Sequence, residues 1–341
     1  MQPKIGDEEQ DLFLHGVCRA GVRQQPTRLD CFVASRFARF TRARARRACK
    51  MGAIHVNGVP KKPAYRVRSL DEISLWLPHP TVMSLTPTPM ALDIVYEDAD
   101  ILVINKAAGV VCHPSRGHWE GTLLHGLLHH LCPNLQGDAL QDKVFLVHRL
   151  DRGTSGLLVV ARHLAAAVHF FEQMQAGEIQ RIYHAFVWGK FPYDQTTVDV
   201  PIAIDPSRPG GSFVPKDPKE GKQAITHIER IAVGADFSRV ACRLETGRTH
   251  QIRVHLQHLG YPLLGDPHYG AASAFLDQIA ADARLTSVGE TWLGRIPTRQ
   301  ALHAASLRFL HPTTGAQMRF SAELPPDLMV LSDVLQGLAV G

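Results

Sequence analysis

One loop of the sequence places an acid where catalytic groups commonly lie. Asp151 stands in a polar stretch that begins at His148 and leads through Gly153 and Ser155 into the apolar run 157–161. A short apolar run next to turn residues predicts a buried strand. We therefore expect Asp151 to be a reactive carboxylate held at the mouth of a buried strand.

Two later segments add an aromatic ring and a guanidinium. Residues 180–189 have the pattern of a strand that presents Tyr183. Residues 245–255 contain Gly247-Arg248-Thr249, and the glycine-bounded stretch 260–266 follows them. An acid, a ring and a cation of this kind form a candidate active site only if the fold brings the three segments together.

In chain order, the three segments resemble those of the RluA-type pseudouridine synthases. Further matches extend the resemblance over most of residues 92–320. These matches are Asn105-Lys106, Gly109, His113-Pro114, Leu302-His303-Ala304 and His311-Pro312. Each motif is short, but so long an ordered set is highly specific. Ala107 departs from the family, which usually has proline there.

The resemblance implies an isomerisation of uridine in RNA that needs no cofactor and no metal. The bond from ribose to the ring nitrogen breaks, the base turns, and carbon 5 is joined to the ribose instead. In this family Asp151 would act as nucleophile or base, and Arg149 would fill the gap left by the flipped nucleotide. Tyr183 would lie against the uracil and help remove the proton from carbon 5. Arg248 would pair with Asp151 and favour its ionised form.

Each of these residues also has an ordinary structural interpretation. Asp151 could bond neighbouring backbone amides, as aspartates in turns often do. Tyr183 could be a packing residue of its strand. Arg248 could lie on the surface, and Arg149 could be a phosphate contact. The three segments taken together favour the catalytic interpretation.

The histidines offer a different hypothesis, a zinc site. His125 and His129 would share a helix face, and His250, His255 and His258 lie close together in the chain. The sequence lacks a His-Glu-x-x-His frame and a cysteine pair that would complete such a site. We therefore expect no metal.

Apolar runs of residues 92–325 predict an α+β catalytic domain with a large mixed, mainly antiparallel sheet. The pseudouridine synthase fold that the resemblance implies has this architecture. The predicted strands include 94–96, 101–104, 157–161, 183–187 and 241–244, and the run 252–256 has a similar pattern. A helix is predicted over 164–174, with Leu164, Val168 and Phe171 on one side. Residues 205–222 are expected to form a flexible arm beside the active site. The roles of 205–222 and 271–300 cannot be read from the sequence.

The N-terminal part of the chain concentrates positive charge. Residues 19–70 hold 14 Lys and Arg against the single acid Asp30, although the whole chain is only +5. The usual partner of so confined a patch is a phosphate backbone. Helices are predicted over 28–40 and from an N-cap at Thr41 to Gly52. The expected RNA-binding residues are Arg28, Arg39, Arg42, Arg46, Arg47 and Lys50 here, with Arg149 and Arg253 in the catalytic domain.

Residues 26–78 resemble a small α/β RNA-binding module found in a ribosomal protein, tyrosyl-tRNA synthetases and RNA-modifying enzymes. The resemblance is carried by Thr27-Arg28-Leu29-Asp30, the basic second helix and residues 52–58. Leu70-Asp71 replaces the usual Gly-Asp, so we expect that turn to differ. We predict an N-terminal extension 1–25, a proline-rich linker 79–91 and a C-terminal tail 326–341 around the two domains.

Composition limits the remaining possibilities. The longest apolar runs are far below the ~20 residues of a bilayer span, and the N-terminus lacks the pattern of a secretory signal. Six scattered cysteines predict reduced thiols rather than disulfides. We expect a cytoplasmic monomer acting on structured RNA, with large-subunit ribosomal RNA favoured over transfer RNA. A noncatalytic RNA-binding or ribosome-assembly protein on the same scaffold is the alternative.

Overall fold

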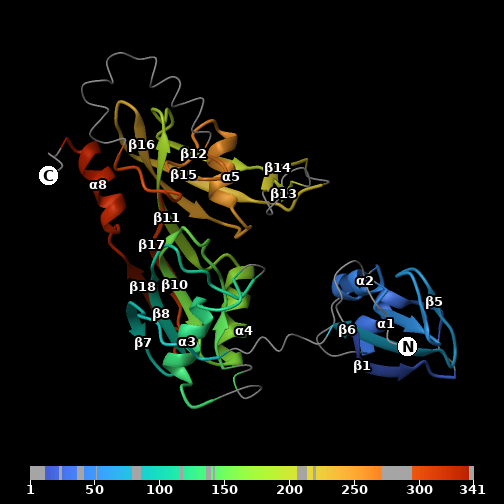
Figure 1. The fold of residues 1–341 in the computed structure, drawn as a ribbon. Coiled ribbons are helices and arrows are strands. Elements are labelled where there is room, and N and C mark those ends of the chain that lie inside the picture. Colours follow the sequence, from blue (N-terminus) through green and yellow to red (C-terminus); the bar gives the residue numbers. More distant parts are fainter. Residues whose placement is uncertain are drawn as a thin grey trace. The chain divides into compact units, whose positions relative to one another are not determined.

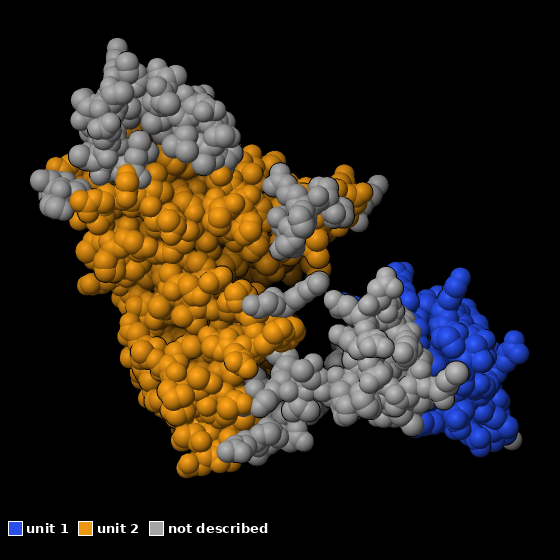
Figure 2. Space-filling model, viewed as in Figure 1, with its two compact units in different colours: residues 1–84 blue, residues 85–341 orange. Residues whose placement is uncertain are grey.

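The chain forms two compact units, residues 1–84 and 85–341 (Figure 2). The computed structural model describes residues 12–22, 25–36, 42–50, 52–78, 86–115, 118–135, 140, 143–205, 213–217, 220–270 and 294–337. No helix within these ranges is both long enough and apolar enough to cross a membrane.

The N-terminal unit is a small sheet packed with two helices (Figure 1). Its main sheet has the strand order β1-β6-β3-β4 and a second, short pair joins β2 to β5. The elements are β1 (Leu12–Arg19), β2 (Thr27–Arg28), α1 (Leu29–Arg36), α2 (Arg42–Lys50), β3 (Ile54–Val56), β4 (Val59–Pro60), β5 (Arg66–Val67) and β6 (Glu72–Pro78). Because β1 pairs with β6 over its whole length, residues 12–19 belong to the module. The predicted separate extension 1–25 is wrong in this respect.

Helix α1 confirms the predicted helix over the residues that the structure describes. Leu29, Phe32 and Val33 are buried and pack in one cluster with Ala45 and Ala48 of α2. Phe37, Phe40 and the predicted cap at Thr41 lie outside the described residues. The burial of Ala45, Ala48 and Cys49 in this cluster explains why α2 forms a helix although most of its residues are basic.

Two turns fix the remainder of this unit. Asn57 and Gly58 have φ of 52° and 78°, the left-handed pair that a two-residue hairpin requires between β3 and β4. Leu70 has φ 66°, so it adopts the backbone conformation that favours glycine. The expectation that this turn differs from the family's therefore concerns its residue type, and it stays a prediction for the backbone. Asp71 secures the turn by accepting bonds from the Asn57 amide and the Tyr65 hydroxyl.

The second unit is built on a 10-stranded sheet with the order β12-β15-β16-β11-β17-β10-β8-β7 and with β18 and β9 beside it. Only the β10–β17 pair is parallel, which confirms a mixed, mainly antiparallel sheet. Its strands are β7 (Ile94–Glu97), β8 (Ile101–Lys106), β9 (Phe145–Leu146), β10 (Ser155–Ala161), β11 (Gln180–Trp188), β12 (Gln195–Asp199), β15 (Ile225–Val233), β16 (Phe237–Leu244), β17 (Leu302–Leu310) and β18 (Gln317–Ser321). The hairpin of β13 (Ile202–Ile204) and β14 (Phe213–Pro215) stands apart from this sheet.

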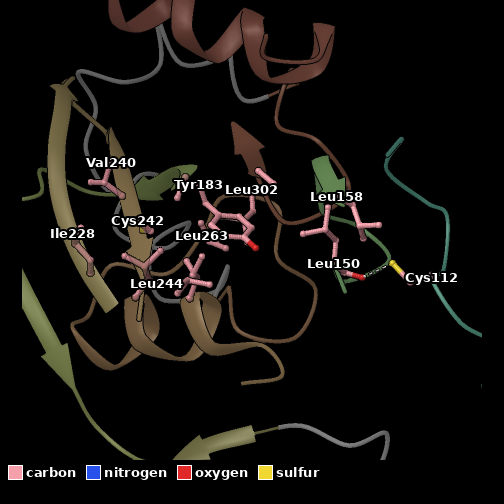
Figure 3. Packing of buried hydrophobic residues seen from close by; sticks show 14 of the residues in the cluster. Cys112, Leu150, Leu158, Tyr183, Ile228, Val240, Cys242, Leu244, Leu263 and Leu302 are labelled. Atoms are coloured by element: carbon pink, nitrogen blue, oxygen red, sulfur yellow. Dashed lines mark hydrogen bonds between the residues drawn. The ribbon is translucent and has the colours of Figure 1, made fainter. Parts of the chain in front are cut away.

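Helices cover both faces of the sheet. Strand β10 is buried throughout, with Leu158 and Val160 in one core cluster and Leu157 and Val159 in another. The first cluster receives α3 (Leu123–Leu131) and α5 (Gln251–His258), and the second receives α4 (Leu164–Gln175). Figure 3 shows the first cluster, in which Tyr183 packs near Leu263 and Leu302. This face of the sheet also carries the active-site loop.

Helix α4 confirms the predicted helix 164–174, but its two apolar stripes differ in burial. Ala167 and Phe170 are buried against the sheet, whereas Leu164, Val168 and Phe171 are 46–60% exposed. The helix has apolar residues on more than one side, so periodicity alone did not identify the inward one.

Two other segments differ from expectation. Residues 252–256 alternate like a strand but form part of α5, because Ile252 and Leu256, four residues apart, both enter the core. Residues 326–335 form α8 (Pro326–Leu335), whose Leu328 and Leu331 are buried. They pack with Phe186 and Trp188 of the sheet, so this segment is part of the domain and not a tail.

Candidate active site

Asp151 lies in the loop between β9 and β10, as predicted. The preceding Leu150 is buried in the core, and its carbonyl accepts a bond from the Cys112 thiol at 3.3 Å (Figure 3). The Thr154 amide donates to the Asp151 carbonyl at 3.0 Å and closes a turn. The loop is therefore anchored on both sides of the acid, which directs the carboxylate away from the core.

A second support of this loop comes from residues just before β17. The Gln300 amide donates to the Thr154 hydroxyl at 3.1 Å, and Arg299 donates to the Gly153 carbonyl at 2.9 Å. A Cβ at position 153 would lie 2.3 Å from the Gln300 side-chain oxygen, so a larger residue there would displace the Gln300 side chain. Arg299 is itself held by Asp327 of α8 at 2.7 and 2.9 Å. No motif in residues 271–300 had indicated these contacts.

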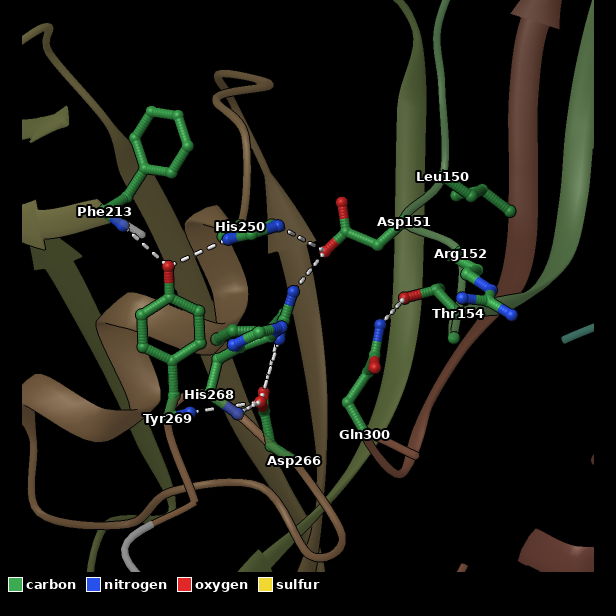
Figure 4. Close-up of polar contacts among 12 residues, drawn as sticks. Leu150, Asp151, Arg152, Thr154, Phe213, His250, Asp266, His268, Tyr269 and Gln300 are labelled. Carbon is green, nitrogen blue, oxygen red and sulfur yellow. Dashed lines mark hydrogen bonds and ion pairs between the residues drawn. The ribbon is translucent and has the colours of Figure 1, made fainter. Parts of the chain in front are cut away.

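Asp151 forms an ion pair with Arg253, not with Arg248. The Nη1 atom of Arg253 donates to Asp151 Oδ2 at 3.0 Å, and the rest of the guanidinium binds Asp266 at 2.7 and 2.8 Å (Figure 4). Arg253 points inward from α5 and its side chain is only 4% exposed. It was predicted to bind RNA, but here it joins two carboxylates.

Arg248 lies before α5 in the loop, which explains why the predicted pairing is wrong. Its Nε donates to the Gln223 carbonyl at 2.9 Å, and its amide donates to the Gln251 side chain at 2.9 Å. Both arginines belong to the same motif, so the sequence could not separate them. Helix α5 starts between the two arginines, and its geometry directs the side chain of Arg253, not that of Arg248, toward Asp151.

His250 provides a second contact to the acid. Its Nε2 lies 3.8 Å from Asp151 Oδ2, and its Nδ1 lies 2.8 Å from the Tyr269 hydroxyl (Figure 4). The same hydroxyl accepts the Phe213 amide at 2.8 Å. The ring of Tyr269 also lies 4.8 Å from the Arg253 guanidinium. Asp266, His250 and Tyr269 therefore surround the Asp151–Arg253 pair, although none had been predicted as a site residue.

Asp151, His250 and Arg253 line a cavity of about 620 Å³. The cavity brings together Asp151, Tyr183 and Arg248, which were predicted as the catalytic set, and Arg149 at its rim. Arg149 is exposed, and Tyr183 is 5% exposed at the wall. The three predicted segments thus share one cleft, although the pairing within it differs from the prediction.

Burial sets the protonation of several lining groups. It raises the pKa of Tyr183 above its ordinary value, so the phenol is neutral near pH 7. Burial, together with the nearby Arg181, lowers the pKa of His148 to about 3. The Val159 amide donates to the neutral His148 ring at 3.1 Å. These two side chains are therefore uncharged near pH 7.

The predicted RNA-binding residues of the N-terminal unit fall into two groups. Arg42, Arg46, Arg47 and Lys50 are exposed on α2, and Arg42 also lies 3.7 Å from the Asp30 carboxylate. In contrast, Arg28 binds the buried Asp30 at 2.9 and 3.0 Å. Arg28 therefore supports the module through this pair. Arg39 lies outside the described residues.

Three of the five histidines considered for zinc have other partners. His125 contacts the Thr122 hydroxyl at 2.7 Å, and His255 bonds Thr226 and the Val200 carbonyl, both at 2.9 Å. His250 contacts Tyr269, as described above. Among the described residues, the grouping that approaches a metal-ligand arrangement is Asp98, Asp100 and His311. There the Asp98 carboxylate accepts the backbone amides of Asp100 and Ile101, which is a turn-closing role.

Comparison with known proteins agrees with this site. The family model described as RNA pseudouridylate synthase matches residues 100–258, and the S4 domain model matches residues 27–73. The fold and site thus define a pseudouridine synthase with an N-terminal RNA-binding module. The chain belongs to the RluA-type family of RNA pseudouridine synthases, which are isomerases.

Individual relatives are similar over nearly the whole chain. An uncharacterized RNA pseudouridine synthase, YlyB, of Bacillus subtilis (strain 168) is 38% identical over 93% of this chain and 97% of its own length. The ribosomal large subunit pseudouridine synthase D of Neisseria meningitidis serogroup A is 39% identical over 91% of this chain and 79% of its own. Among solved structures, human RNA pseudouridylate synthase domain containing 1 has a TM-score of 0.52 at 26% identity, covering 71% of this chain and 89% of that chain.

Proposed function

We propose that this enzyme converts uridines of large-subunit ribosomal RNA to pseudouridine by extruding the base into the cavity around Asp151. The observation that carries the mechanism is the orientation of the acid. Both Arg253 and His250 approach Oδ2 of Asp151, and within the described part of the chain no protein group bonds Oδ1. One carboxylate oxygen is thus held by the protein while the other is available to the nucleoside.

The ion pair with Arg253 fixes the position of the Asp151 carboxylate. Asp266 in turn keeps the Arg253 guanidinium in position. An ionised Asp151 can attack the sugar or take a proton beside it. The glycosidic bond to ring nitrogen 1 then breaks, the base turns, and carbon 5 bonds to the ribose. Carbon 5 loses its proton and nitrogen 1 gains one, so the product is an isomer of the substrate.

The lining residues suggest how the nucleoside is held. Tyr183 presents a buried ring at the cavity wall, and aromatic rings stack on bases with about 1–3 kcal/mol per base. Because the phenol is neutral at pH 7, we assign Tyr183 to stacking rather than to proton removal. Arg149 is exposed at the rim and would occupy the space that the flipped nucleotide leaves.

Ribosomal RNA is favoured by two observations. Several relatives are named ribosomal large subunit pseudouridine synthase D, and an exposed basic helix in a separate unit suits a large structured RNA. Transfer RNA is the alternative substrate, since pockets and motifs do not encode RNA shape.

The test compares wild type with Asp151→Asn, which preserves the shape of the side chain and removes its charge. Unmodified large-subunit ribosomal RNA and total transfer RNA are incubated with each, and pseudouridine is mapped by carbodiimide modification. We expect wild type to modify discrete uridines of the ribosomal RNA and Asp151→Asn to lose at least ~10³-fold in rate while still binding. Asp199→Asn, on the exposed end of β12, serves as the matched control and should retain activity.

Two outcomes would contradict the proposal. Modification of transfer RNA alone would overturn the substrate. Wild type that binds ribosomal RNA tightly and modifies nothing would favour the noncatalytic RNA-binding protein.

A further inference from the structure

The backbone at His250 is unusual for its residue type. His250 precedes α5 and has φ 59° and ψ 16°, the left-handed region that non-glycine residues rarely adopt. Such conformations cost about 1–3 kcal/mol and persist where the surroundings impose them. Here the conformation places the ring between Tyr269 and Asp151, 2.8 Å from one and 3.8 Å from the other (Figure 4).

The contacts of Tyr269 determine which nitrogen of His250 carries the proton. Its phenol oxygen accepts the Phe213 amide, and its one proton needs an acceptor of its own. Tyr269 is only 1% exposed, and a buried donor without an acceptor is strongly disfavoured. Among the described residues the acceptor within reach is His250 Nδ1. The phenol therefore donates to Nδ1, and the ring proton lies on Nε2, facing Asp151.

The charge states of the two groups agree with this assignment. Burial lowers the pKa of His250, which keeps the ring neutral and leaves one nitrogen free to accept. Burial also raises the pKa of Tyr269, which keeps its hydroxyl protonated.

We propose that His250 is a positioning residue for Asp151, and that Tyr269 and the Phe213 amide select the tautomer that presents Nε2–H to Oδ2. This proposal rests on the proposed function of Asp151. His250 and Arg253 then bind the same carboxylate oxygen from two directions and turn Oδ1 toward the substrate. The 3.8 Å separation exceeds a hydrogen bond, and such contacts often tighten only when substrate binds.

The contacts that run from the Phe213 amide through Tyr269 and His250 to Asp151 also connect the active site to the β13–β14 hairpin. Phe213 is the first residue of β14, and its ring lies 5.5 Å from the His250 ring in an edge-on arrangement. A displacement of β14 would remove the donor that orients the Tyr269 hydroxyl. The position of this hairpin therefore affects the orientation of Asp151.

The decisive variant is Tyr269→Phe, which removes one oxygen and keeps the ring over Arg253. In the full-length protein, ¹⁵N-histidine spectra report the tautomer, and the His250 signal is identified by its loss in His250→Gln. We expect wild type to show the Nε2–H tautomer at pH 7.5 and Tyr269→Phe to show loss of that preference. The kcat should fall about 5- to 30-fold with KM unchanged within about twofold, the effect of one hydrogen bond.

Two comparisons separate positioning from general damage. Tyr261→Phe acts on a tyrosine that packs against the core and removes a hydroxyl that has no hydrogen bond among the described residues, and it should leave both readouts unchanged. His250→Gln and His250→Ala share the backbone strain, but only glutamine keeps an N–H donor, so it should lose less kcat. A wild-type Nδ1–H tautomer, or full kcat in Tyr269→Phe, would overturn the proposal. The tautomer is measured without RNA. An error in the proposed RNA substrate would therefore change the pseudouridine mapping but not the histidine spectra.

Discussion

At the scale of single residues, the site depends on one guanidinium shared by two acids. Arg253 is nearly buried and bonds both Asp151 and Asp266. Burial opposes charge on Asp266, but the bonds from Arg253 outweigh it and hold the pKa of this carboxyl below its ordinary value. Arg253 thus neutralises the charge of Asp266 and orients the carboxylate of Asp151. Arg248 faces the same cavity but bonds a backbone carbonyl, so we expect the two arginines to respond differently to substitution.

We predict that Arg253→Lys lowers kcat by about 100-fold, because an ammonium cannot reach Asp151 while binding both oxygens of Asp266. Arg248→Lys is the matched control and should stay within about fivefold. Single-turnover rates of tritium release from RNA labelled at carbon 5 of uridine measure both. A larger loss in Arg248→Lys than in Arg253→Lys would show that Arg248 is the catalytic cation.

At the scale of elements, the turn before β6 shows local strain that the sequence pattern did not reveal. Leu70 has φ 66° and its side chain is 56% exposed. The Leu70 amide bonds the Ala20 carbonyl, and the Asp71 carboxylate bonds the Arg68 amide. These bonds form only in this turn conformation. Leu70 therefore adopts a left-handed backbone conformation that glycine adopts at lower cost.

We predict that Leu70→Gly stabilises the N-terminal unit by about 0.5–1 kcal/mol, the balance between released strain and the greater chain entropy of glycine. Hydrogen exchange of β3 and β6 amides in the full-length protein measures the change. Leu70→Ala keeps the strain and is the control. Faster exchange in Leu70→Gly than in wild type would show that the side chain contributes more than its backbone conformation costs.

Helix α2 carries Arg42, Arg46 and Lys50 as exposed side chains, and residues four apart lie on one side of a helix. Replacing these three by glutamine should weaken RNA binding. It should also reduce the slope of log Kd against log salt by about 2–3, one counterion-release increment per lost phosphate contact. Binding titrations from about 50 to 300 mM salt measure the slope. Arg319→Gln, on β18 of the other unit, should leave it unchanged; equal slopes for all variants would exclude α2 from the RNA interface.

At the scale of the whole molecule, both units contain carboxyls with a lowered pKa, such as Asp98 and Asp30, but the catalytic unit also contains histidines with a strongly lowered pKa. In the catalytic unit, burial lowers the pKa of His148 to about 3 and those of His184 and His303 to about 4. In the N-terminal unit the lowered groups are carboxylates, and the bond from Arg28 brings the pKa of Asp30 to about 2. The two units should therefore respond to acid over different ranges.

A histidine with a lowered folded pKa takes up its proton mainly on unfolding, so its stability contribution is complete above pH ~6.5 and declines below it. Asp30 contributes fully above pH ~4 and loses this as pH falls toward its folded value. We predict that the Tm of the catalytic unit falls by more than about 5 °C from pH 7 to pH 5, while that of the N-terminal unit changes little. Calorimetry of the full-length protein measures both, and a catalytic transition independent of pH in this range would contradict the prediction.

Much of the fold and part of the site were predictable from local pattern. The strands around Asp151, the helix α4 and the basic helix α2 follow from periodicity, turn residues and charge. Residues 252–256 were misassigned because alternation and helical spacing both fit a short run. The exposed side of α4 and the docking of α8 depend on which surface a distant strand presents, and no local pattern encodes that.

The sequence by itself determined the chemical inventory, namely an acid in a turn, a ring on a strand, paired arginines and a basic module. The tertiary structure alone decided that Arg253 and not Arg248 meets Asp151, because the start of α5 sets which side chain points inward. It also brought Arg299, Gln300 and Tyr269 to the site from far along the chain. Local interactions specify elements, whereas the partners of a buried charge are selected by packing and desolvation among segments that meet only in the folded chain.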